Sequence, residues 1–138
     1  RAILAGEPIR IFNHGRMRRD FTYIDDIVEG VVRVLDRPAA PDPSFDPDDP
    51  DPSTSSAPYR IFNIGNDQPT ELLHYVDVLE AELGVTAIRQ LEDIQPGDVP
   101  ATWADVDALR DAVGFTPATS VEEGVRRFVA WYRDFYRV

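Results

Sequence analysis

The residues best suited to chemistry lie in one eight-residue string, Arg19-Asp-Phe-Thr-Tyr-Ile-Asp-Asp26. The string sets an arginine at the edge of an extended segment and two adjacent acids at the start of a predicted helix. With Arg16 and Arg18, Arg19 forms the densest basic cluster, and arginine binds phosphate through a planar fork of N–H donors. The spacing suits a nucleotide or a sugar phosphate. A surface cluster that pairs with nearby acids has the same spacing, so both interpretations stay open.

A second candidate is the turn Gln95-Pro-Gly-Asp98-Val-Pro100. A Pro-Gly pair favours a tight turn, which would hold the carboxylate of Asp98 in a fixed direction. A fixed carboxylate suits the hydroxyl groups of a ribose or a sugar. An aspartate with no role beyond the turn is the simpler alternative.

The composition excludes several other kinds of site. All fourteen basic residues are arginine, so no lysine can cradle a phosphate or assist catalysis. The eight glycines never approach the Gly-x-Gly-x-x-Gly spacing of a dinucleotide-binding turn. There is no cysteine, and His14 and His74 have no partner at metal-ligand spacing, so both are predicted to be structural or exposed. We therefore expect no cofactor or metal on this chain alone.

Charge and hydropathy limit the partners further. The net charge of −11 opposes nonspecific binding to nucleic acid, which needs a positive field along the phosphates. No apolar run approaches the ~18 residues of a membrane-spanning helix, so no membrane interaction is expected. A hydrophobic content of 43% supports a core, and the length fits a single domain over residues 1–138.

The first half of the chain predicts few regular elements. Residues 1–6 are typical of the end of a helix, closed by Gly6. A strand is expected at 9–13 and a short extended piece at 21–23. A mostly buried helix should follow from an N-cap at Asp25 or Asp26. Residues 37–58, rich in proline and serine, are predicted to form a long loop.

The second half shows clearer periodicity and predicts the remaining elements. They are a strand at 59–64, a helix over 72–83 capped by Thr70 and closed by Gly84, a strand at 86–91, a short helix to Val113 that Asp105 can cap, and a last helix over 121–135 with a Ser120–Glu123 capping box. The alternation of strands and helices indicates α/β structure, with too few strands for a full doubly wound domain.

Four strings occur in an order and at distances that resemble one family. They are Arg19-Asp-Phe-Thr-Tyr-Ile-Asp-Asp26, Tyr59 through Asn63-Ile-Gly65-Asn66, Gln95-Pro-Gly-Asp-Val-Pro100 and Ala104-Asp-Val-Asp107. The chain resembles the C-terminal portion of extended short-chain dehydrogenase/reductases that act on nucleotide sugars. Within that group it is most similar to UDP-glucuronate 4-epimerases, and the resemblance covers essentially the whole chain.

The resemblance implies a Rossmann-type enzyme of which this chain is the substrate-binding part, without the N-terminal dinucleotide-binding domain. The implied activity is an NAD-dependent isomerase that interconverts UDP-glucuronate and UDP-galacturonate at C4. NAD and the catalytic Tyr/Lys pair would belong to the missing domain, so the chain alone is expected to be inactive. The implied partner is a UDP-sugar, and the implied enzyme is a cytoplasmic homodimer.

The resemblance also assigns roles to particular residues. Arg19 corresponds to the arginine that binds the phosphates or ribose of the nucleotide, and Asp98 to the carboxylate on the ribose side. Gln95 stands where related hexose epimerases often carry an arginine, so it brings no charge to the phosphates. The strand expected along the uracil contributes Ile9, Arg10 and Phe12.

Three alternatives remain at this stage. The first is a nucleotide-sugar dehydratase or decarboxylase of the same fold, which would differ chiefly in residues of the missing domain. The second is a binding module that holds a nucleotide or a partner protein without any chemistry. The third is a structural remnant that binds no ligand.

Overall fold

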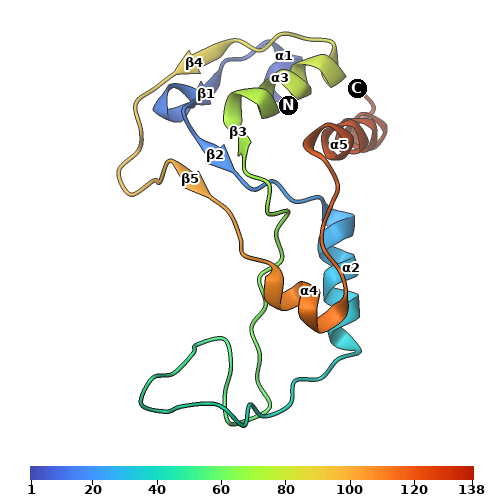
Figure 1. Cartoon of the computed structure of the whole chain (residues 1–138). Helices are drawn as coiled ribbons and strands as arrows, with labels where there is room; N and C mark the ends of the chain where they lie inside the picture. The colour runs from blue at the N-terminus through green and yellow to red at the C-terminus, as the bar shows by residue number, and fades with distance from the viewer.

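The computed structural model describes residues 1–138 and confirms the α/β expectation. Figure 1 shows an upper body, built around α1, α3, α5 and the short strands, and a lower arm with α2, α4 and the long loop 37–58 at its end. The elements are α1 (Ala2–Ala5), β1 (Ile9–Ile11), the 3-10 helix η1 (Phe12–Gly15), β2 (Arg18–Arg19), α2 (Ile24–Leu35), β3 (Thr70–Glu71), α3 (Leu72–Leu83), β4 (Arg89–Leu91), β5 (Ala101–Thr102), α4 (Asp107–Val113) and α5 (Val121–Tyr136).

The strands form two small sheets. β1 and β4 pair in parallel, with Ile11 opposite Leu91. In the second sheet β2 lies between β3, which is antiparallel to it, and β5, which is parallel. The extended piece predicted at 21–23 forms no strand, and the strand of this region is β2 at Arg18–Arg19. There the backbone N–H of Arg18 donates to the carbonyl of Pro100, beside β5.

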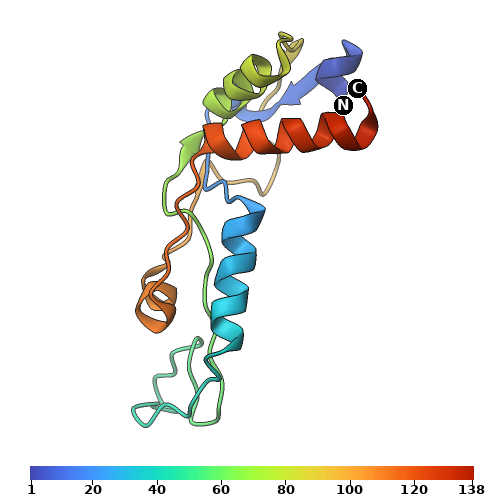
Figure 2. The ribbon, with the colours of Figure 1, turned by 90° about the vertical axis from the view of Figure 1, so that its right-hand side faces the viewer.

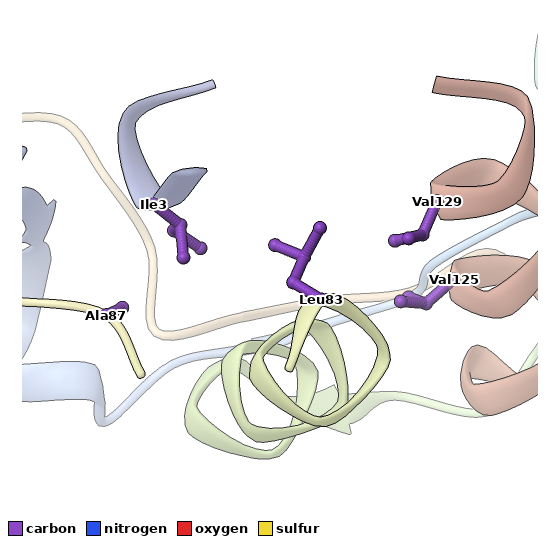
Figure 3. Close-up of a cluster of buried hydrophobic side chains, with 5 residues drawn as sticks. All are labelled: Ile3, Leu83, Ala87, Val125 and Val129. Atoms are coloured by element: carbon purple, nitrogen blue, oxygen red, sulfur yellow. The ribbon is translucent and has the colours of Figure 1, made fainter. Parts of the chain in front are cut away.

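A small hydrophobic core holds the upper body together. Figure 3 shows its side chains converging from α1, α3, α5 and the segment after α3: Ile3, Leu83, Ala87, Val125 and Val129. The helix predicted over 72–83 is confirmed, and Gly84 ends it in the left-handed region, with φ 67°. This end lets α3 turn toward β4 immediately after its last buried leucine.

The last helix is also confirmed, with half of its predicted capping box. The side chain of Ser120 accepts a hydrogen bond from the backbone N–H of Glu123. Glu123 does not return the bond, because its carboxylate accepts from Arg126 and Arg127 within the same helix. None of the helices combines the length and the apolar character that crossing a lipid bilayer requires.

Helix α2 differs from its prediction in two ways. It begins at Ile24 with Tyr23 as N-cap, so Asp25 and Asp26 lie inside its first turn. It is also mostly exposed, although its apolar spacing predicted a buried helix. The α2 stripe, whose side chains remain 50% to 77% exposed, consists of Ile24, Val28, Val31, Val32 and Leu35. The stripe has the right periodicity, but no element of the chain covers it.

Three further local predictions are wrong. Residues 59–64 form no strand, because no neighbouring strand pairs with them. Their backbone makes only isolated hydrogen bonds, such as that from the N–H of Ile61 to the carbonyl of Ser53. Thr70 lies in β3 and makes no cap bond to α3, whose N-cap is Glu71. The helix predicted to end at Val113 is confirmed, but its N-cap is Val106 and not Asp105, whose carboxylate accepts from the N–H of Asp107. The loop 37–58 contains neither helix nor strand, as predicted.

Candidate functional site

The candidate site centres on Arg19, which β2 holds in the middle of the three-stranded sheet. Its Nη2 donates a hydrogen bond of 2.8 Å to Oδ1 of Asp98, a residue 79 positions later in the chain. Both side chains are partly exposed, at 25% and 34%. An arginine has five N–H donors, and this one also donates to the carbonyl of Arg18, so further donors remain for a ligand.

The turn that carries Asp98 has the predicted form. Its backbone N–H donates to the carbonyl of Gln95 at 3.1 Å, and Gly97 between them adopts a φ of 84°. Oδ1 of Asp98 accepts from both Arg19 and the backbone N–H of Val99, which fixes the carboxylate. The second oxygen of this carboxylate can accept from a hydroxyl group. Cation and acceptor side by side can bind a phosphate and a neighbouring hydroxyl.

Asp20, which follows Arg19 directly, organises the surrounding loops. Its carboxylate accepts from the backbone N–H groups of Asn66 and Asp67 at 3.1 Å and of Ala104 at 3.4 Å. Gly65 fits this junction only because it has no side chain: a Cβ there would lie 2.6 Å from Asp20 and from Ala104. Asp20 therefore joins two loops beneath β2. Sequence analysis gave it no separate role.

Asp25 and Asp26, the two adjacent acids of the string, are also in contact with other elements of the chain. Oδ2 of Asp26 accepts from the backbone N–H groups of Ala118 and Thr119, which ties the first turn of α2 to the segment before α5. Asp25 lies 3.5 Å from Arg127 of α5. The acids at the helix start thus link α2 to α5 and to the segment before it.

A separate group of predicted residues lies on β1 and η1. Arg10 donates two hydrogen bonds to the carboxylate of Glu92, at 2.7 and 2.5 Å, and its guanidinium lies 4.8 Å from the ring centroid of Phe12. Hydrogen bonding from Arg10 lowers the pKa of Glu92. Ile9 packs against the core cluster, so its side chain is structural. Sequence analysis missed Glu92.

The structure thus divides the predicted residues into two groups. Arg19, Asp98 and Gln95 meet at the turn, although Gln95 contributes its backbone carbonyl there and its side chain is exposed. Ile9, Arg10 and Phe12 lie together on β1 and the start of η1. Glu92 could have been noted as an acid that directly follows a predicted strand. Its contact with Arg10 could not have been predicted, because it depends on the pairing of β1 with β4.

The histidines are exposed, as predicted, and each meets one carboxylate. Nε2 of His14 lies 3.0 Å from Asp93, and Nε2 of His74 lies 2.8 Å from Glu122. No group of three or more His, Cys, Asp or Glu side chains is arranged to hold a metal ion.

Comparison with known proteins shows what the chain is similar to. Residues 1–65 match the NAD dependent epimerase/dehydratase family. The chain is 45% identical over 137 residues to Protein CapI of Staphylococcus aureus, covering 99% of this chain and 41% of that protein. It is 46% identical to a probable UDP-glucuronate 4-epimerase of Rhizobium meliloti, covering 99% of this chain and 40% of that protein.

Solved structures agree with these relatives. The fold superimposes with a TM-score of 0.75, at 25% identity, on the UDP-glucuronic acid 4-epimerase of Bacillus cereus in complex with UDP-glucuronic acid and NAD. The match covers 98% of this chain and 38% of that structure. The chain spans about two fifths of the length of the relatives it matches. It resembles the NAD dependent epimerase/dehydratase family, and it aligns with the C-terminal portion of epimerases that have the extended short-chain dehydrogenase/reductase fold.

Proposed function

We propose that this chain is the UDP-sugar-binding portion of an NAD-dependent epimerase that interconverts UDP-glucuronate and UDP-galacturonate at C4. The observation that carries the proposal is the contact between Arg19 and Asp98. It joins a phosphate-binding cation to a hydroxyl-binding carboxylate, which is the pair of groups that a nucleoside diphosphate sugar requires. The similarity to UDP-glucuronate 4-epimerases supports the choice of sugar.

In this proposal each group of residues has its own part of the ligand. The free N–H donors of Arg19 bind the diphosphate, and the carboxylate of Asp98 accepts from the ribose. Backbone groups of Ile9 and Arg10 and the ring of Phe12 lie along the uracil. Gln95, which is neutral, shapes the turn through its carbonyl.

The acidic character of the chain is compatible with an anionic ligand. The net charge of −11 acts diffusely, because salt screens exposed charges beyond a Debye length of about 8 Å. A hydrogen bond to a charged group contributes about 1.5–3 kcal/mol at short range. Two or three such bonds from Arg19 therefore outweigh the distant acids.

The residues of this chain do not fit NAD itself. A dinucleotide requires a glycine-rich turn that opens a helix after a strand. Here Gly84 and Gly114 end helices, and Gly97 lies in a turn that precedes no helix. We assign NAD, and the redox chemistry it supplies, to the portion of the enzyme outside these residues. The chain alone is then inactive and contributes binding and orientation of the substrate.

A titration with UDP-glucuronate, followed by amide chemical shifts, tests the binding role. We expect saturable shifts at Phe12, Arg19 and Asp98. Arg19→Ala should abolish them, because it removes the donors to the phosphates. Arg33→Ala is the matched control: this exposed arginine also pairs with one carboxylate, that of Glu29, but lies on α2. It should bind as the unchanged chain does.

The same titration with UDP and with free glucuronate shows which part of the ligand is recognised. Binding of UDP but not of glucuronate supports the assignment of Arg19 to the phosphates. A fusion in which this chain replaces the matching portion of the Rhizobium meliloti relative then tests catalysis, as interconversion of the two UDP-sugars. Equal shifts in Arg19→Ala, or no binding by either the chain or the fusion at millimolar ligand, would contradict the proposal.

A further inference from the structure

A cavity lies at the far end of the arm, away from the sheet that carries Arg19. Figure 2 shows the loop 37–58 beneath α2 and α4, at the opposite end of the molecule from α3 and α5. This arm cavity lies between the loop, α4 and residues 59–62, and its volume is about 660 Å³. Pockets that bind small molecules have volumes of roughly 300–1,000 Å³, so the arm cavity is large enough for a ligand.

Two arginines line the arm cavity, and neither has a carboxylate partner. Most arginines of the chain do form an ion pair with a carboxylate. Arg60 instead lies over the ring of Phe62, with its guanidinium carbon 5.5 Å from the ring centroid. Arg37 donates one long hydrogen bond, of 3.4 Å, from Nη1 to the carbonyl of Ala112. Because an arginine has five N–H donors, most donors of this pair remain free for a ligand.

The two acids that line the arm cavity are bound to other groups. Oδ1 of Asp42 accepts from both the N–H and the hydroxyl of Ser44, and this hydrogen bonding lowers the pKa of Asp42. Asp111 lies 3.8 Å from Arg110, which is not part of the lining. The charges of two arginines and two aspartates cancel, so the cavity does not attract every anion through its field. A ligand must use direct hydrogen bonds to the free guanidinium donors.

Aromatic rings and hydroxyl groups complete the lining of the arm cavity. Tyr59 is 44% exposed, and Phe62, which carries the guanidinium of Arg60, is half-buried. Nucleic-acid bases stack on aromatic side chains and on guanidinium planes, so this group suits a planar ring. The hydroxyl group of Thr54 also lines the cavity and can bond to a polar part of the ligand. The lining therefore combines phosphate donors with a surface for a flat ring.

We propose that the arm cavity is a second binding site, which takes a nucleoside phosphate. The phosphate binds to the free donors of Arg37 and Arg60. The base stacks beside the rings of Tyr59 and Phe62. A free phosphate lacks a ring and a sugar phosphate lacks a flat one, so each would use only part of the cavity. The site is separate from the one proposed around Arg19, which lies on β2 in the upper body (Figure 1), so the two ligands would not compete.

A titration with UMP, followed by amide chemical shifts, tests the proposal. It uses the Arg19→Ala chain, so that the site proposed for the UDP-sugar does not take up the nucleotide. We expect saturable shifts at Thr54, Arg60 and Ala108, which line the arm cavity from three segments. Inorganic phosphate and glucose 1-phosphate distinguish the possible sources of the phosphate. Each should bind at least tenfold more weakly than UMP, because neither has a flat ring.

Two variants in the same background locate the binding. Arg60→Gln should weaken UMP binding at least tenfold, because it removes a charged donor that the fold itself does not use. Arg110→Gln is the matched control: this arginine lies on α4 but pairs with Asp107 and does not line the cavity. It should bind UMP as its parent does. If Arg60→Gln disturbs folding, Ala108→Phe decides, because it fills the cavity without changing any charge and should abolish the shifts.

Three results would overturn the proposal. The first is the absence of saturable shifts at the cavity residues with millimolar UMP. The second is equal weakening by Arg60→Gln and Arg110→Gln, since the anion would then bind the exposed arginines of this region in general. The third is equal affinity for UMP and inorganic phosphate, which would leave the rings without a role. Because Arg19 is replaced in every sample, none of these results bears on the proposed function.

Discussion

Helices α2 and α3 each contain 12 residues and carry apolar side chains at helical spacing, yet they differ in what covers them. Helix α3 packs against α5 and buries Val76 and Leu83. The only buried residue of α2 is Gly30, which has no side chain to contribute, and the α2 stripe remains open. One helix therefore belongs to a core and the other to a surface.

The difference shows what an apolar pattern means. Periodicity identifies a helix face whose burial lowers the free energy of the protein, but it does not say which element or protein buries that face. The prediction that α2 is mostly buried was wrong for this reason. The apolar spacing was recognised correctly, but no element of these 138 residues covers the exposed side of the helix.

The largest expected effect comes from matched leucine truncations in the two helices. Leu83→Ala should lower the free energy of unfolding by about 2–5 kcal/mol, because it empties part of the core between α3 and α5. Leu35→Ala, at the exposed end of α2, should change it by less than about 0.5 kcal/mol. Urea unfolding of both variants measures the difference. A cost of several kcal/mol for Leu35→Ala would show that the isolated chain already covers the stripe.

A second pair of variants compares two acids of the same string. Asp20→Ala should cost about 1–3 kcal/mol, because three backbone N–H groups lose their acceptor. Asp25→Ala removes only a contact of 3.5 Å with Arg127 on an exposed surface, so its effect should be below about 1 kcal/mol. Thermal or urea unfolding distinguishes them. Equal costs would mean that Asp20 is not the junction between the two loops.

The smallest expected effect is a pH dependence of stability that differs between α3 and α2. Hydrogen bonding from Arg89 lowers the pKa of Glu80 on α3. A carboxylate whose pKa is lower in the folded than in the unfolded protein stabilises the fold at any pH above its unfolded pKa of about 4.3. This stabilisation is lost as the pH falls through the folded-state pKa. Glu80→Gln should therefore be less stable than the unchanged chain at pH 7, and the deficit should shrink near pH 3.

The control is Glu29→Gln on α2, whose carboxylate reaches only Arg33 one turn away. It should show a smaller deficit at pH 7, since such pairs on an exposed helix contribute only about 0.3–0.5 kcal/mol. Unfolding curves at both pH values give the comparison. A Glu80→Gln deficit that stays constant between pH 7 and pH 3 would contradict the role of its charge.

The candidate site was only partly predictable. Arg19 and Asp98 were singled out separately, each from the chemistry of a short string and from the family resemblance. Their contact spans 79 positions and exists because β5 pairs with β2 and brings the turn before it alongside. The pairing of Arg10 with Glu92 depends in the same way on β1 and β4.

What the sequence determined by itself is local. Gly84 and Gly114 end helices because glycine adopts the left-handed conformation without steric cost, and Ser120 caps α5 because its hydroxyl reaches a free N–H three residues later. Tertiary structure alone decided which strands pair and which apolar faces are covered. Residues 59–64 show this limit, since a strand needs a partner that no local pattern can supply.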